Sequence, residues 1–158
     1  MSEEADVNEE VDLESLMRDY AEWLSTKEGA HSQTMRFVKE EDLFEVDLGD
    51  PYPTVGVYLS EIDEEFYGEP TGFFVECPLG PPDPSLDFNK LLAFFSEQPL
   101  MCRLCLRTDE EPQLVVEAAL PLKKVEFDLV DTLIREVAAI GGEMEDFLSG
   151  KTTPAAVP

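Results

Sequence analysis

Residues 100–120, LMCRLCLRTDEEPQLVVEAAL, contain two apolar runs separated by a polar turn. The runs at 100–107 and 113–120 are rich in the Leu, Val and Cys residues of a half-buried strand. The turn TDEEP between them has the polar and proline residues of a hairpin loop. This stretch therefore predicts two antiparallel strands.

One register of this hairpin brings two opposite charges together. If Leu104 lies opposite Val116, then Arg103 lies opposite Glu117. Opposite charges that face each other across two strands stabilise the pairing. We therefore expect an Arg103–Glu117 pair on one face of the sheet.

Four segments upstream also have strand-like patterns. Phe44, Val46 and Leu48 alternate with acidic residues, which places the apolar side chains on one face, because successive side chains of a strand point to opposite sides. The predicted strands are 34–38, 43–48, 55–59 and 72–77, the last being GFFVEC with Phe73, Val75 and Cys77 on one face.

Three segments have helical spacing of apolar residues. The first follows the N-cap residue Asp12 and stops at Gly29, with Leu13, Leu16, Met17, Tyr20 and Leu24 on one side. The second is capped by Ser85 or Asp87 and has the apolar stripe Phe88, Leu91, Leu92 and Phe95. The third is capped by Asp128, with Leu129, Leu133, Val137, Ile140, Met144 and Phe147 or Leu148 facing inward.

These elements predict an α+β protein with an antiparallel sheet of five or six strands and three helices, in the order α-β-β-β(-β)-α-β-β-α. Residues 11–150 form a single predicted domain, because no linker or repeat interrupts them. The acidic residues 1–10 and the proline-containing tail 151–158 are expected to be flexible.

The charge of the chain restricts its partners. It has 36 acidic and 11 basic residues among 158, a net charge of -25. Such a surface repels nucleic acid and anionic lipid, both of which need clustered Lys and Arg. We expect a protein partner, and no nucleic acid, membrane or small-molecule substrate.

The location expected from the sequence is the cytoplasm. The first residues are acidic where a secretory signal is basic, and no apolar run approaches the roughly 20 residues of a membrane span. Cys77, Cys102 and Cys105 are an odd number of thiols without a secretory context, so we expect them to be reduced.

No motif in the chain points to catalysis or to a cofactor. Cys102 and Cys105, with Cys77 and His31, have the residue types of a zinc site, but two positions three apart in a strand lie on opposite faces. The acidic runs lack the spacing of a calcium loop, and no phosphate-binding glycine motif is present. We therefore predict no catalytic residue, cofactor or metal.

Aromatic residues outside the predicted core are the candidates for protein binding. Phe94 lies about 100° around its helix from the apolar stripe, so it either widens the core or meets another protein. Phe74 lies on the strand face opposite Phe73, while Phe66 and Tyr67 stand in an acidic loop. We assign Phe94, Phe74, Phe66 and Tyr67 to a protein-binding surface, and Leu92 to the core.

The succession of predicted elements, together with the sequence of residues 86–148, resembles the type III secretion chaperone-like superfamily, which includes the class I secretion chaperones and the YbjN-like proteins. The resemblance covers roughly residues 12–148. The similarity lies in a helix containing Asn89 before a hairpin, the apolar-Pro step at Leu120 and Pro121, and a long final helix. It implies an α+β homodimer that holds a segment of a partner protein, such as a secreted effector, on apolar surface. A YbjN-like regulatory adaptor and an acidic nucleic-acid mimic that inhibits a basic protein are the alternatives.

Overall fold

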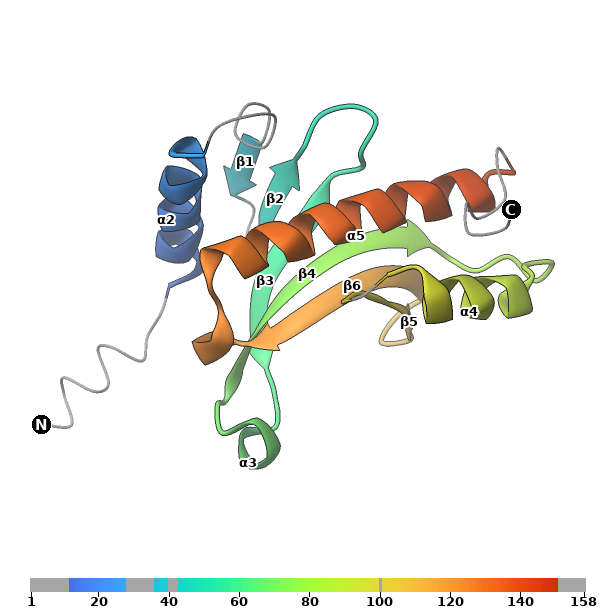
Figure 1. Ribbon diagram of the computed structural model, residues 1–158. Helices are drawn as coiled ribbons and strands as arrows, with labels where there is room; N and C mark the ends of the chain where they lie inside the picture. The colour runs from blue at the N-terminus through green and yellow to red at the C-terminus, as the bar shows by residue number, and fades with distance from the viewer. Residues whose placement is uncertain (1–11, 28–35, 40–42, 100, 151–158) are drawn as a thin grey trace, which may run out of the picture.

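A six-stranded antiparallel sheet carries helices on one of its faces (Figure 1). The computed structural model describes residues 12–27, 36–39, 43–99 and 101–150. The strand order within these residues is β1-β2-β3-β4-β6-β5. The strands are β1 (Arg36–Lys39), β2 (Phe44–Asp47), β3 (Val55–Glu61), β4 (Thr71–Gly80), β5 (Arg103–Arg107) and β6 (Gln113–Pro121). The longer helices are α2 (Leu13–Ser25), α4 (Phe88–Glu97) and α5 (Phe127–Leu148).

The predicted α+β class and antiparallel sheet are confirmed, and so is the hairpin register. Leu104 pairs with Val116 and Arg103 with Glu117 between β5 and β6. Charge complementarity and apolar alternation both agree with this register. At the opposite edge of the sheet, β1 lies antiparallel to β2.

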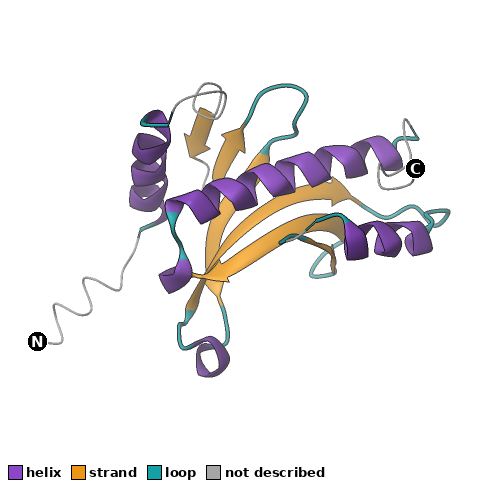
Figure 2. Ribbon diagram, viewed as in Figure 1, coloured by secondary structure: helices purple, strands orange, loops and turns teal. Residues whose placement is uncertain are grey.

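The hydrophobic core fills the space between the sheet and the helices. Helix α5 lies across β4 and β6, and α2 and α4 flank it on either side (Figures 1 and 2). From β4, Phe73, Val75 and Cys77 are buried beneath α5, as predicted. The opposite face of the sheet has no helix over it within the described residues (Figure 2).

Helix α2 is attached to the body by side-chain contacts. Asp12 is its N-cap, as predicted, and accepts a hydrogen bond from the Glu14 backbone nitrogen. The buried Tyr20 donates its hydroxyl hydrogen bond to Asp131 of α5 at 2.8 Å. Lys39 of β1 forms an ion pair with Glu14 at 3.0 Å. These contacts join the first helix to both the last helix and the edge of the sheet.

The described chain has a fourth helix that the sequence did not predict. Helix α3 (Glu64–Tyr67) is a single turn in the connection from β3 to β4, and a 3-10 turn, η2 (Leu122–Lys124), follows β6. Four residues are too few for a helical period to show in the sequence. The predicted cap of the last helix is also wrong, because α5 begins after Glu126 and places Asp128 in its first turn.

Several predictions fall on residues outside the described part of the chain. They concern the stop at Gly29, the position of His31, and the termini at 1–10 and 151–158. Within the described residues, no helix has both the length and the hydropathy required to cross a bilayer.

Candidate functional site

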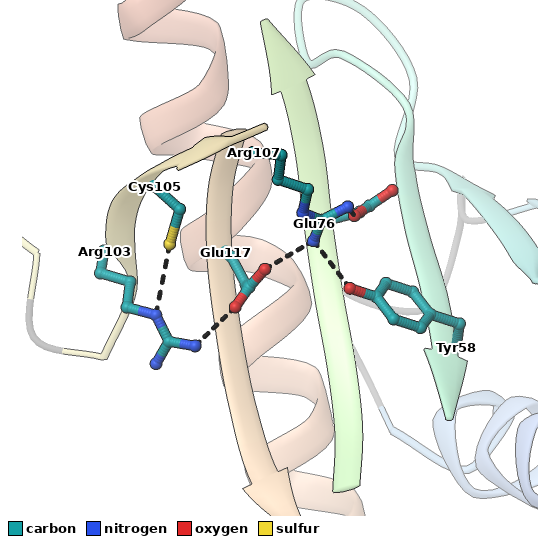
Figure 3. A network of polar contacts seen from close by, with 6 residues as sticks. All are labelled: Tyr58, Glu76, Arg103, Cys105, Arg107 and Glu117. Atoms are coloured by element: carbon teal, nitrogen blue, oxygen red, sulfur yellow. Dashed lines mark hydrogen bonds and ion pairs between the residues drawn. The ribbon is translucent and has the colours of Figure 1, made fainter. Parts of the chain in front are cut away.

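A network of charged side chains lies on the face of the sheet that the helices leave uncovered (Figure 3). Its centre is Arg107 of β5, whose guanidinium donates to Glu117 of β6 at 2.6 Å and to the Tyr58 hydroxyl of β3 at 2.7 Å. Glu76 of β4 forms a further ion pair with Arg107. Arg103 donates to the other carboxylate oxygen of Glu117 at 2.5 Å. We call these five residues the open-face network.

The two carboxylates of this network are buried although they face away from the helices. Glu76 and Glu117 are only 8% and 6% exposed, because the arginine side chains and Tyr58 lie over them. The Glu76 contact is an ion pair without an aligned hydrogen bond to Oε1. Burial and the negative charge of Glu76 raise the pKa of Tyr58 to about 12, so the hydroxyl keeps its proton at neutral pH.

This arrangement favours a structural role for the network. Each buried carboxylate already faces a guanidinium, which compensates the charge that burial would otherwise penalise. The contacts span β3, β4, β6 and β5, so they fix four strands relative to one another. The network therefore supports whatever lies beside it on the same face.

The described cysteines do not converge on one point. Cys102 is buried in the core, and Cys105 lies on the open face, where its sulfur accepts a hydrogen bond from Arg103 at 3.4 Å (Figure 3). Within the described chain, no cluster of three His, Cys, Asp or Glu residues has the geometry for a metal ion. Glu136 of α5 accepts hydrogen bonds from the Met101 and Cys102 backbone nitrogens at 2.8 and 2.7 Å, which anchors the start of β5.

The segment 61–70, which comprises the last residue of β3 and the connection to β4, projects beyond the end of the sheet and contains α3 (Figure 1). We call it the α3 tip. Asp63 caps its helix, accepting from the Glu65 and Phe66 nitrogens at 3.0 and 3.4 Å. Gly68 ends the helix with a positive φ of 70°, a conformation that glycine adopts without strain.

Two further contacts fix the α3 tip. Lys123 of η2 donates to the Gly68 carbonyl at 3.0 Å. The Ile62 nitrogen donates to the Pro70 carbonyl at 2.9 Å, which closes the base of the tip. The tip is thus a defined turn with contacts at its start, end and base, and it presents its side chains in fixed positions.

Phe66 and Tyr67 are the side chains that the α3 tip exposes. Phe66 is 78% and Tyr67 45% exposed, which agrees with their predicted surface position. Their rings meet edge to face with centroids 4.8 Å apart. Burying an exposed Phe side chain is favourable by about 1.5–3 kcal/mol, and this free energy is available when a partner covers the ring.

A small hollow of about 110 Å³ lies between the α3 tip and the open face. The residues that line it are Ile62, Tyr67, Phe74, Arg103, Ala119, Leu120 and Pro121. We call it the tip pocket.

The open-face network reaches the tip pocket at two points. The Phe74 ring stacks on the Tyr58 ring of the network, with the ring centroids 5.2 Å apart. Arg103 belongs to both the network and the pocket wall. Phe74, predicted as a binding residue on the face opposite Phe73, is therefore half-buried and lines this hollow. The network holds its walls in place.

The predicted exposure of Phe94 is wrong. Phe94 is 1% exposed and packs in the core with Leu91, whereas Leu92, assigned to the core, is 64% exposed. The helix is rotated relative to the predicted stripe because Leu91 and Phe94, three residues apart, form its inward face. Phe88 and Leu92, four residues apart, lie on the outer side of α4 instead.

Phe88 and Leu92 are candidate binding residues that sequence reasoning missed. Helix α4 is apolar at Phe88, Leu91, Leu92, Phe94 and Phe95. With apolar residues on most of its circumference, the periodicity does not decide which face is buried. The excess of apolar residues did indicate an exposed apolar side, but not which residues form it.

In comparisons with known proteins, neither a family model nor a curated protein matches this chain. The function is therefore argued from the geometry of the α3 tip, the tip pocket and the outer side of α4.

Proposed function

We propose that this chain is a non-catalytic, cytosolic binding protein of the type III secretion chaperone-like kind, which holds a segment of a partner protein on apolar surface. The observation that carries the proposal is the α3 tip, where an ordered turn presents Phe66 to solvent beside the tip pocket. Rigid, exposed aromatic side chains are typical of the anchors in protein interfaces.

The size of the surface is consistent with this role. Ordering a flexible partner segment costs about 2–5 kcal/mol. Burying one large apolar side chain contributes about 1.5–3 kcal/mol. Phe66, Tyr67 and one partner side chain in the tip pocket would together contribute about 4.5–9 kcal/mol, which is of the same size as the ordering cost or larger. The tip is therefore large enough to hold a short segment.

The proposal includes a homodimer formed through the outer side of α4. Phe88 and Leu92 are exposed there. Helix α4 itself has one base, Lys90, and one acid, Glu97, in a chain whose net charge is -25. Two such chains repel each other least where acids are fewest, so this region favours self-association.

A matched capture experiment tests the proposed function. The wild-type protein, a Phe66→Ala/Tyr67→Ala variant and a Tyr52→Ala control would each be used as bait in extracts of the native cells. Tyr52 is also an exposed aromatic residue, but it lies in the loop between β2 and β3. We expect one protein to bind the wild type and the control and to be lost from the tip variant.

The bound segment would then be mapped by protease protection of the captured protein in the complex. A protected stretch of the partner supports the holding of a segment. Capture of the same proteins by all three baits would refute the assignment of the binding surface.

A further inference from the structure

We propose that the segment held at the α3 tip is basic: one apolar side chain enters the tip pocket, and Lys or Arg residues beside it face the acidic side of the tip. This inference rests on the proposed function and adds the chemistry of the partner. It is carried by three features of the tip, namely its carboxylates, its exposed aromatic ring and the compensated charge of the pocket wall.

The α3 tip concentrates negative charge. Its residues 61–70 contain Glu61, Asp63, Glu64, Glu65 and Glu69 and no basic residue. Asp63 uses one oxygen to cap the helix, while Glu61, Glu64 and Glu65 are exposed. No ion pair of the described chain includes any of these five acids.

A basic partner would relieve the repulsion among the tip acids. Like charges held close together on one turn repel, and a partner segment of opposite charge removes that cost. The net charge of -25 would also steer a basic segment toward the protein before contact.

The exposed Phe66 ring favours the same partner chemistry. The face of an aromatic ring attracts a cation, and the attraction adds to that of nearby carboxylates. Glu64 and Glu65 precede Phe66 directly on the one-turn helix. A Lys or Arg side chain lying over Phe66 would therefore be within the same short turn as two exposed carboxylates.

The tip pocket is suited to the apolar part of the segment. Most of its walls are apolar, from Ile62, Phe74, Ala119 and Pro121. Arg103 also lines it, but its charge is paired with Glu117 at 2.5 Å. The hollow therefore offers no unpaired carboxylate to attract a Lys or Arg side chain, so the apolar anchor enters it and the basic residues lie toward α3.

Selection from a phage-displayed library of random dodecapeptides tests the proposal. Peptides would be enriched on the wild-type protein after removal of those that bind the Phe66→Ala/Tyr67→Ala variant. We expect the enriched sequences to combine a Leu or aromatic residue with neighbouring Lys or Arg residues. Circular dichroism of the variant would verify that it is folded.

Two charge variants then locate the interaction. Glu64→Gln/Glu65→Gln removes two charges at the tip, and Glu110→Gln/Glu111→Gln removes two exposed charges at the turn between β5 and β6. We expect the enriched peptide to lose about tenfold in affinity with the tip variant, a loss typical of close charge pairs, and less than about twofold with the control.

Each other outcome has a definite meaning. Neutral or acidic peptides that depend on Phe66 and Tyr67 would overturn the basic partner and leave the proposed function intact. An equal loss with both charge variants would overturn the role of the tip carboxylates. If no enriched peptide depends on Phe66 and Tyr67, both this inference and the binding surface of the proposed function are wrong.

Discussion

Helix α5 approaches β4 closely at Gly141. A Cβ atom added there would lie 2.6 Å from Cys77 Sγ and 3.0 Å from Cys77 Cβ, both too close for atoms that are not bonded. We predict that Gly141→Ala destabilises the protein by about 1–3 kcal/mol through overpacking, although alanine is the better helix former. Urea unfolding measures the difference.

Gly142 provides the matched control for this prediction. A Cβ atom added at Gly142 would lie 3.3 Å from Pro53. The replacement of glycine by alanine would stabilise the helix by up to about 1 kcal/mol. Gly142→Ala is expected to be nearly neutral, and Cys77→Ala should recover part of the loss in Gly141→Ala. Equal effects at the two glycines would contradict the close approach of α5 to β4.

Cys77 makes the stability of the fold dependent on alkaline pH. Burial, with the charges of Glu145 and Glu76, raises the pKa of its thiol from 9.0 to about 12. Between these values the unfolded chain loses the proton and the folded chain keeps it. The free energy of unfolding therefore falls as pH rises from about 9 to about 12, by up to about 1.4 kcal/mol per pH unit from this group.

The alkaline dependence is measured by urea unfolding under reducing conditions at several pH values above neutral. We predict that Cys77→Ala lowers stability throughout but flattens its decline above pH 9, relative to the wild type. Cys105→Ala, at a half-exposed thiol, should keep the wild-type slope. A slope in Cys77→Ala identical to that of the wild type would show that this thiol is not responsible.

The residues of the open-face network illustrate how far sequence alone can predict contacts. The Arg103–Glu117 pair follows from the register of one hairpin, which is local. Arg107 contacts Glu76 and Tyr58 on β4 and β3, and these contacts depend on β6 lying between β5 and β4. No local pattern specifies that order, so the network could not be predicted.

Which side of helix α4 is buried depends on how the whole helix packs against the core. Phe94 is buried and Leu92 exposed, the reverse of the sequence-based assignment. We predict that Phe94→Asp unfolds the protein, because it places an unpaired charge in the core. Leu92→Asp should change the free energy of unfolding of the monomer, measured in dilute solution at low salt, by no more than about 0.5 kcal/mol. Urea titration followed by circular dichroism distinguishes the two, and equal losses would contradict this orientation of α4.

Helix α3 shows why short elements escape prediction and which signals reveal them. The sequence DEEFYG from Asp63 to Gly68 has an N-cap residue at one end and a glycine at the other, with four residues between them. Such a segment has no room for an apolar period, so its helix depends on capping and on contacts such as that of Lys123. The capping signal was present in the sequence. The tip pocket was not predictable, since it requires β6 and the tip to be neighbours.

The net charge of -25 makes two copies of the whole molecule repel each other, which opposes the homodimer that we propose. Salt weakens repulsion between exposed charges, with a screening length of about 30 Å at 0.01 M and about 3 Å at 1 M. Apolar contact through Phe88 and Leu92 is not weakened in this way. We therefore predict that the dimer becomes tighter as the salt concentration rises, whereas a dimer held by ion pairs would become weaker.

Light scattering at tens of micromolar protein, in about 0.02 M and about 0.5 M sodium chloride, measures this dependence, because these conditions span a large change in screening. The Leu92→Asp variant should be a monomer at both salt concentrations, since it places a charge in the contact. The control variant Tyr52→Asp adds the same charge at an exposed aromatic position outside α4, and it should still dimerise at high salt. A monomeric mass for the wild type in both solutions would rule out self-association through α4. The α3 tip would then have to hold its partner segment as a single copy, and the binding energy would come from Phe66, Tyr67 and the tip pocket of one chain alone.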